Sequence, residues 1–138
     1  MRIMAIDYGD AHTGIAISDP TGFLAGFTTV INAYRPEVVA EQVAALAKEH
    51  GVEELVLGHP INMDGTRGPR AEKAQSMKTL LEETTSLPVV LWDERRTTID
   101  AHQILMNSGK NAKKRKKVVD AVAATLILEG YLTYKKTH

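Results

Sequence analysis

Hydrophobic and polar positions in the first quarter of the chain predict three short strands. Apolar residues alternate loosely around Ile3 and Ile6 in residues 2–7, and comparable segments follow at 14–19 and 23–31. The stretch from Asp19 to Gly22 carries turn residues between the second and third segments. Because these segments follow one another at short intervals, we expect them to form an antiparallel meander.

The rest of the chain alternates between helical and strand patterns. Pro36 is suited to a first helical turn, Val39, Val43 and Leu46 follow at helical spacing, and Gly51 supplies a stop. Thr97, with Asp100 three residues on, is typical of a helix N-cap. The further elements expected are a strand at 54–58, a polar loop at 59–68, a helix opening near Pro69, a strand at 88–92, a helix from Thr97 to about 107–109, and a helix at 113–134.

This order predicts an α/β fold with a mixed five-stranded sheet, in which a meander of three strands precedes two parallel strands and helices cover both faces. The sequence shows no repeat, low-complexity linker or Pro/Gly/Ser-rich spacer, so we expect one domain over residues 1–138. In such sheets ligands gather at the carboxyl ends of the parallel strands. Asp7 and the pair Asp93 and Glu94 stand at such ends.

Composition narrows the possible chemistry. Hydrophobic residues make up 43% and charged residues 25% of the chain, as in ordinary globular proteins. The absence of Cys leaves only oxygen and imidazole groups as metal ligands. The formal net charge of zero hides an uneven distribution, since Lys and Arg are sparse before Arg67 and concentrated from Lys110 to Lys117. That run would attract a polyanion whatever the total charge.

The apolar segments are too short for a membrane protein. Few apolar residues precede Asp7, fewer than a secretory signal needs, and no later apolar run approaches the length that spans a bilayer. We therefore expect a cytoplasmic protein that does not enter a membrane.

Asp7 is the first candidate for chemistry. It closes the first predicted strand and is followed by Gly9 and Gly14, which would let a phosphate approach the backbone. Such a carboxylate suits a metal ligand or a nucleotide site. An Asp that caps the following turn through backbone N–H groups is an equally good interpretation of the position alone.

Asp120 lies in an apolar segment that predicts a helix buried on nearly every face. A carboxylate held there needs a cation, a full set of hydrogen bonds or a proton, and a divalent metal beside Asp7 would supply the cation. The alternative is that Asp120 sits near the helix N-terminus and pairs with Lys116 or Lys117.

Asp93 and Glu94 end the strand at 88–92. Because side chains alternate along a strand, normally one of the two points into a shared site, and Glu94 is the preferred candidate with Asp93 kept as a second possible metal ligand. A surface turn in which Glu94 pairs with Arg95 or Arg96 is the alternative.

Three clustered carboxylates repel one another unless cations lie among them. We therefore predict a site in which Asp7, Glu94 and Asp120 bind Mg²⁺ or Mn²⁺, as two ions that activate a water and clamp a scissile phosphate.

Basic residues predict contacts with a nucleic-acid backbone. The loop after the strand at 54–58 should overhang the same edge of the sheet as Asp7, and aromatic residues are too few for an extended base-stacking platform, so we expect recognition of shape and backbone. Trp92 is expected in the core. The candidate nucleic-acid contacts are His12 in its protonated form, Arg67, Arg70, Arg95, Lys110, Lys113, Lys114, Arg115, Lys116 and Lys117.

Four ordered motifs over essentially the whole chain resemble the YqgF-type family, whose members are described as pre-16S rRNA nucleases and, by an older label, as Holliday junction resolvases. The motifs are Asp7-x-Gly9 with Gly14-Ile15-Ala16 and Asp19; Gly58-x-Pro60 with Asp64-Gly65-Thr66; Asp93-Glu94-Arg95-x-Thr97-Thr98; and Asp120-Ala121-x-Ala123-Ala124 with Leu126-Ile127-Leu128.

The resemblance implies a ribonuclease H-like fold, a cytoplasmic location and a role in maturing the 5′ end of the small-subunit rRNA precursor. It assigns the acidic positions to Asp7, Glu94 and Asp120. RNA is then the expected partner, with structured DNA and a pre-ribosomal particle as further possibilities, and the protein would be a monomer or a weak homodimer. His12 and His59 depart from the family, which has a basic and an apolar residue there.

Three other functions stay open from the sequence. A four-way junction resolvase would require a symmetric dimer to cut two strands together. A non-catalytic module would bind RNA or ribosomes and use the carboxylates structurally. A nucleotide-binding phosphotransferase also begins with an Asp-x-Gly turn after its first strand, but it needs a second domain around the nucleotide.

Overall fold

The computed structural model describes residues 1–21, 25–59, 68–93 and 112–137. Within these ranges, the side chains of residues 70, 112–120, 136 and 137 lie outside the description.

Five strands form one mixed sheet in the order β3-β2-β1-β4-β5. The strands are β1 (Arg2–Asp7), β2 (His12–Ser18), β3 (Ala25–Asn32), β4 (Val52–His59) and β5 (Val89–Asp93). β1 to β3 pair antiparallel, whereas β4 runs parallel to both β1 and β5. The predicted meander followed by two parallel strands is therefore confirmed.

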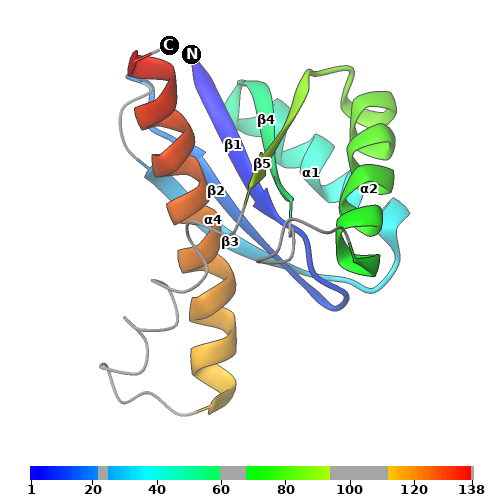
Figure 1. Ribbon diagram of the computed structural model, residues 1–138. Helices are drawn as coiled ribbons and strands as arrows, with labels where there is room; N and C mark the ends of the chain where they lie inside the picture. The colour runs from blue at the N-terminus through cyan, green and yellow to red at the C-terminus, as the bar shows by residue number, and fades with distance from the viewer. Residues whose placement is uncertain (22–24, 60–67, 94–111, 138) are drawn as a thin grey trace.

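Helices cover both faces of this sheet (Figure 1). α1 (Pro36–His50) and α2 (Pro69–Thr85) pack on one face, and α4 (Ala112–Thr137) packs on the other. We call these the α1/α2 face and the α4 face. The helix predicted from Thr97 to about 107–109 falls outside the described residues.

Local sequence explains where α1 and α2 begin and end. Both start with Pro at a position whose N–H would have no partner within the helix. α1 ends at Gly51, whose φ of 67° is left-handed and whose N–H bonds the carbonyl of Ala47. α2 ends at Ser86 in the same conformation.

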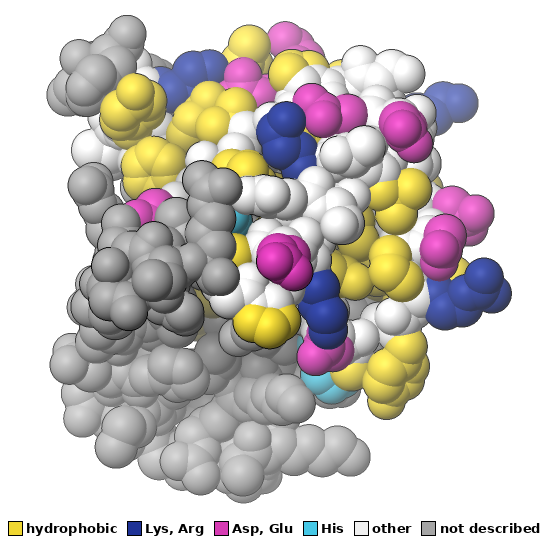
Figure 2. All heavy atoms as spheres, turned by 45° about the vertical axis from the view of Figure 1, so that its right-hand side comes forward, with side chains coloured by type: hydrophobic (Ala, Val, Ile, Leu, Met, Phe, Trp, Pro, Cys, Tyr) yellow, Lys and Arg dark blue, Asp and Glu magenta, His cyan; other side chains and the backbone are white. Residues whose placement is uncertain are grey.

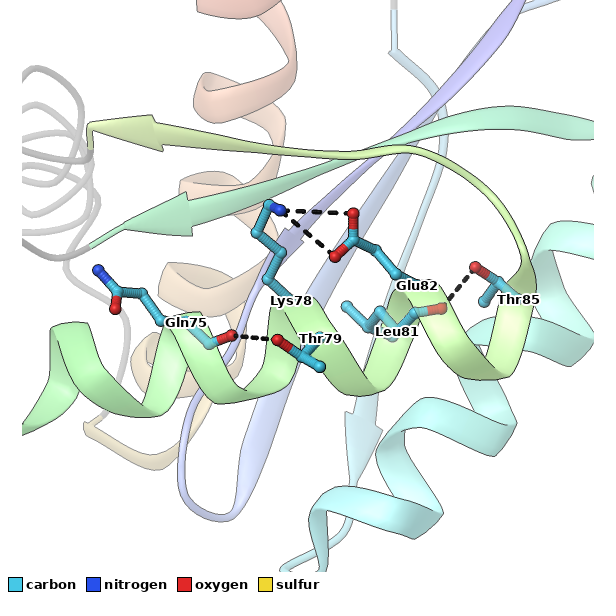
Figure 3. A network of polar contacts seen from close by, with 6 residues as sticks. All are labelled: Gln75, Lys78, Thr79, Leu81, Glu82 and Thr85. Atoms are coloured by element: carbon cyan, nitrogen blue, oxygen red, sulfur yellow. Dashed lines mark hydrogen bonds and ion pairs between the residues drawn. The ribbon is translucent and has the colours of Figure 1, made fainter.

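The polar contacts of α2 that Figure 3 draws lie within the helix. The Lys78 ammonium lies 3.3 Å from a Glu82 carboxylate oxygen, one turn away, and the Thr85 hydroxyl donates to the Leu81 carbonyl at 2.7 Å. An exposed pair of this kind contributes only about 0.3–0.5 kcal/mol. The helix is held in place mainly by its buried side chains, such as Met77 and Leu81.

The two faces of the sheet bury separate apolar clusters. On the α1/α2 face, alternate strand residues such as Ile6, Ile15 and Leu57 pack against the two helices. On the α4 face the strand residues are smaller, with Ala5 and Ala16 beneath the helix. Small side chains let α4 lie close to the sheet, where Ile127 and Leu128 are fully buried, each stabilising the fold by about 1.5–3 kcal/mol.

α4 runs antiparallel to β1. Near its end, the Tyr131 hydroxyl donates to the Glu54 carboxylate at 2.5 Å, at the beginning of β4, and Lys135 lies 3.5 Å from the same carboxylate. The first turns of α4 therefore lie toward the carboxyl ends of β1 and β4, past which they project in Figure 1.

The expectation that the last helix is buried on nearly every face is wrong for residues 121–135. The buried residues come in pairs at 123–124, 127–128 and 131–132, and the residues between these pairs are half-buried or exposed. One helix lies across this face of the sheet, so it can bury only the stripe that meets the strands.

The predicted strands and helices within the described residues are confirmed, with shifts of one to three residues at their ends. β2 starts at His12 rather than at Gly14, because His12 and Thr13 pair with Asn32 and Ile31 across the sheet. Among the described helices, none is long and apolar enough to cross a bilayer.

Candidate functional site

The carboxyl ends of three neighbouring strands meet at one edge of the sheet. In the register of the parallel strands, Ile6 stands beside Leu57, and His59 stands beside Asp93. Asp7 ends β1 and Asp93 ends β5, with β4 between them. The sequence prediction that these acidic positions reach a common edge is therefore correct for Asp7 and Asp93. We call this edge the carboxylate edge.

Asp7 and Asp93 belong to opposite faces of the sheet. Ala5 is part of the α4 cluster, so alternation places Asp7 on the α4 face. In β5, Val89 and Leu91 pack on the α1/α2 face, so Asp93 is assigned to that face, beside the buried His59. Asp93 would therefore not coordinate an ion that Asp7 binds on the α4 face.

The surroundings of Asp7 leave its carboxylate available for a ligand. Its cross-strand neighbour is Gly14, which has no side chain to fill the space opposite. Within the described part of the chain, the half-buried Asp7 carboxylate accepts no hydrogen bond and forms no ion pair. A turn-capping Asp would accept bonds from the following backbone N–H groups. The geometry thus favours the ligand interpretation over the capping one.

The backbone of Asp120 lies at about the level of Asp7. Tyr131 marks the level of Glu54, and Glu54 pairs with Ile3. From Ile3 to Asp7 the strand rises by about 13 Å. From Tyr131 back to Asp120 the antiparallel helix covers about 16 Å. The two candidates therefore lie within about one helical turn of the same level, one on the α4 face of the sheet and one on the helix that covers it.

His12 shares the α4 face with Asp7. It has the same parity in β2 as Gly14 and Ala16, and it stands opposite Asn32 in β3. Its Nδ1 donates a hydrogen bond to Oδ1 of Asn32 at 2.6 Å. Because an amide oxygen can only accept, the proton is on Nδ1, and Nε2 is left to contact a phosphate when the ring is protonated. Sequence analysis missed Asn32, since no local pattern reveals the register between β2 and β3.

Much of the predicted site lies outside the described residues. Glu94, Arg67, Arg95 and Lys110 are not described. Arg70 lies in the first turn of α2, and the remaining basic candidates lie in the first turns of α4, but their side chains are not described; these are Lys113, Lys114, Arg115, Lys116 and Lys117. Among the side chains that are described, no three acidic or histidine residues gather closely enough to hold a metal ion. The predicted metal site thus depends on Glu94 and Asp120.

The α1/α2 face carries a cavity of about 670 Å³ with a different character. Tyr8, Tyr34 and Pro36 line it together with Asp10 and Lys73, whose charged groups lie 2.9 Å apart. Figure 2 shows charged side chains of both signs on this face, with apolar ones between them. Burial, and then the negative charge of Asp10, raise the pKa of Tyr8. With its described cation already paired, this cavity is poorly suited to phosphate.

Known proteins match this chain over nearly its whole length. A family model described as "RuvX: Holliday junction resolvase" matches residues 1–134. A protein of Halothermothrix orenii named "Putative pre-16S rRNA nuclease" is 45% identical over 135 residues, which are 98% of this chain and 96% of that protein. A Bacillus subtilis protein with the same name is 43% identical over 134 residues, covering 96% of this chain and 97% of its own length.

Solved structures confirm the fold. Thermus thermophilus RuvC, solved in complex with a Holliday junction substrate, superposes with a TM-score of 0.65 over 99% of this chain and 96% of its own, at 14% sequence identity. A second structure of the same protein gives a TM-score of 0.60. Because the identity is so low, this likeness concerns the fold alone. The ribonuclease H-like architecture implied by the sequence is confirmed.

Proposed function

Because the chain belongs to the RuvX family, also called YqgF-type, we propose that it is a cytoplasmic, metal-dependent nuclease that hydrolyses phosphodiester bonds at the 5′ end of pre-16S rRNA. The relatives that are 43–45% identical carry the name of a nuclease for this substrate. The observation that carries the proposal is the Asp7 carboxylate on the α4 face, which has no partner among the described residues and stands at the level where α4 brings Asp120.

Glu94 completes the proposed set of acidic groups. Glu94 lies outside the described residues and is proposed from its place in the Asp93-Glu94-Arg95 motif, whereas Asp93 belongs to the face opposite Asp7. Asp120 stands four residues before the buried Ala124, the spacing of one helical face. We therefore assign Asp7, Glu94 and Asp120 as ligands and leave Asp93 out of the site.

An all-oxygen donor set fits Mg²⁺ or Mn²⁺ rather than a thiophilic metal. Bound ions, as a pair, would lower the pKa of a bound water and stabilise the leaving oxygen. In the protein itself, the Asp7 carboxylate would hold a cation at the end of β1. His12, oriented by Asn32, would donate to a phosphate oxygen, and the basic first turns of α4 would bind the backbone on either side.

The test compares the full chain with two single Asp→Asn variants. Asp7→Asn removes the proposed ligand, whereas Asp10→Asn makes the same change at an exposed carboxylate that pairs with Lys73. Each protein is incubated with Mn²⁺ and, in separate reactions, a 5′-extended 16S precursor, single-stranded DNA and a four-way junction.

We expect Asp7→Asn to lower precursor cleavage at least a hundredfold and Asp10→Asn to cleave like the parent. Removing the Asp7 charge should also relieve repulsion among the carboxylates, so the metal-free variant should unfold at a slightly higher temperature than the parent. Mn²⁺ should raise the unfolding temperature of the parent and of Asp10→Asn, but not of Asp7→Asn. Cleavage that survives in Asp7→Asn would overturn the assignment.

Resolution of a Holliday junction is the second candidate, favoured by the description of the family model. It requires two copies arranged symmetrically so that paired strands are cut together. Preferential cleavage of the junction by a dimer would establish it in place of RNA processing. Tight RNA binding without any cleavage would instead indicate a non-catalytic module.

A further inference from the structure

Three of the seven aromatic side chains gather on the α4 face, between β5 and the end of α4. The ring centroids of Trp92 and Tyr131 lie 5.9 Å apart at 81°, and those of Trp92 and Tyr134 lie 5.9 Å apart at 66°. Tyr131 and Tyr134 are roughly parallel, with centroids 6.4 Å apart. This group is more than core packing, because Tyr134 is 47% exposed.

These rings border a cavity of about 310 Å³, completed by Val90, Leu91 and Asp93. That volume lies at the lower end of the ~300–1,000 Å³ usual for small-molecule pockets. The pocket therefore suits one flat, aromatic group of the size of a nucleobase better than a folded partner surface.

Two of the three rings are fixed by their neighbours. The Tyr131 hydroxyl donates to Glu54, and Lys135, paired with that carboxylate, lies 5.5 Å from the Tyr131 ring centroid. The Trp92 indole lies directly on α4 at Gly130, where an added Cβ would be only 3.2 Å from Cζ2. Tyr131 and Trp92 thus form a rigid base on which the exposed Tyr134 ring rests.

The pocket lies along the edge strand β5, with its aromatic rings on the α4 face, which is the face of Asp7, and with Asp93 at the carboxylate edge. Trp92 is two residues before Glu94 in sequence and shares the α4 face with Ala5 and Asp7 through the alternation of the strands. A nucleic-acid strand whose phosphate lies over the carboxylates can therefore place a base from a few nucleotides away beside β5. The cavity on the α1/α2 face has no such relation to Asp7.

We propose that the pocket of Trp92, Tyr131 and Tyr134 binds an unpaired nucleobase of the substrate by stacking on Tyr134. The proposal rests on the proposed nuclease function and narrows its substrate class to strands with an unpaired nucleotide a few positions from the scissile bond. A base within a duplex is already stacked between its neighbours and cannot enter. Stacking on aromatic side chains is the usual way in which proteins hold unpaired bases without reading a long sequence.

The single Trp of the chain makes the pocket directly observable. The full chain, with EDTA present so that no cleavage occurs, is titrated with a short unstructured oligoribonucleotide while Trp92 fluorescence is followed. A duplex of the same sequence is titrated in parallel. We expect quenching by the single strand, and an affinity that Tyr134→Ala lowers about tenfold for the single strand but not for the duplex.

Two variants control for indirect effects. Tyr134→Phe keeps the ring and should bind like the parent. Tyr34→Ala removes a tyrosine that is 81% exposed on the α1/α2 face and should change nothing. Thermal unfolding of each variant confirms that the fold is retained.

The proposal is wrong if Tyr134→Ala binds the single strand as tightly as the parent, or if a saturating oligonucleotide leaves Trp92 fluorescence unchanged. It is also wrong if Tyr134→Ala alters sedimentation instead of binding, which would make the pocket a contact between copies of the chain. Cleavage with Mn²⁺ is measured separately. If the parent cleaves RNA but Tyr134→Ala binds the single strand as tightly as the parent, the base-binding pocket alone is refuted. If the single strand quenches Trp92 fluorescence but the parent cleaves nothing, the nuclease function alone is refuted.

Discussion

Replacing Gly9 with Ala should damage the turn that follows Asp7. An added Cβ would lie 2.4 Å from the backbone carbonyl oxygen of His12, closer than any normal contact. That carbonyl cannot easily retreat, because His12 pairs with Asn32 in the sheet and the neighbouring Ala11 carbonyl accepts a hydrogen bond from Ala33 at 3.1 Å. The turn between β1 and β2 must therefore distort.

The cost can be estimated from two opposing effects. Forcing an extra carbon into a packed site costs about 1–3 kcal/mol. Replacing Gly with Ala also restricts the unfolded chain, which raises the free energy of unfolding by about 0.4–1 kcal/mol. The free energy of unfolding should thus fall by about 1–2 kcal/mol, which lowers the melting temperature by roughly 5 °C in a chain of this size.

Gly51→Ala is the matched control. Gly51 has a φ of 67° and no atom within 4 Å of an added Cβ, so its cost is the left-handed backbone alone, about 1 kcal/mol. Both variants should lose similar stability in urea or thermal unfolding. Only Gly9→Ala should also lose cleavage, because its distortion moves Asp7 and His12 while Gly51 lies at the end of α1. A Gly9→Ala protein with the stability and activity of the parent would refute this reasoning.

Two further predictions concern the opposite ends of α4. Burial and the hydrogen bond to Glu54 raise the pKa of Tyr131. The tyrosine therefore stabilises the folded chain below pH 10, and this stabilisation is lost as the pH rises further, because Tyr131 ionises at a lower pH in the unfolded chain than in the folded one. Tyr131→Phe should lower the free energy of unfolding by about 1 kcal/mol at pH 7, and urea unfolding should show this difference shrinking above pH 10. Changing Lys116 and Lys117 to Gln should weaken RNA binding. The slope of log affinity against log salt concentration should become shallower by roughly 0.7–0.9 for each phosphate that is no longer neutralised. An unchanged slope would exclude a phosphate-binding role for these two lysines.

Part of the site followed from the sequence because it depends on local pattern. The alternation around Ile3 and Ile6 and the turn after Asp7 fix where β1 ends, and this end is what brings Asp7 to the carboxylate edge. The alternation in β5 likewise indicated that Asp93 and Glu94 point to opposite faces. It did not indicate that Asp93 belongs to the face opposite Asp7, because that depends on how β5 pairs with β4 and which helix covers each face.

Other features depended on contacts between distant segments. The hydrogen bond between His12 and Asn32 arises from the register of β2 with β3. The aromatic pocket arises because α4 runs back along the sheet and places Tyr131 and Tyr134 beside Trp92, which the sequence assigned to the core. The sequence also could not show that one side of α4 faces away from the sheet, because the hydrophobic residues of a helix do not specify whether other elements pack on one side of it or on both.

The sequence by itself determined the order and type of the elements, the position of Asp7 at a strand end and, through its motifs, the family. These depend on residues close together in the chain, whose periodicity and turn chemistry act before any distant contact forms. The tertiary structure alone decided that Asp7 and Asp93 belong to opposite faces, what orients His12 and where the aromatic rings meet. Those outcomes depend on strand register and helix direction, which are set by the packing of the whole core rather than by any local stretch of residues.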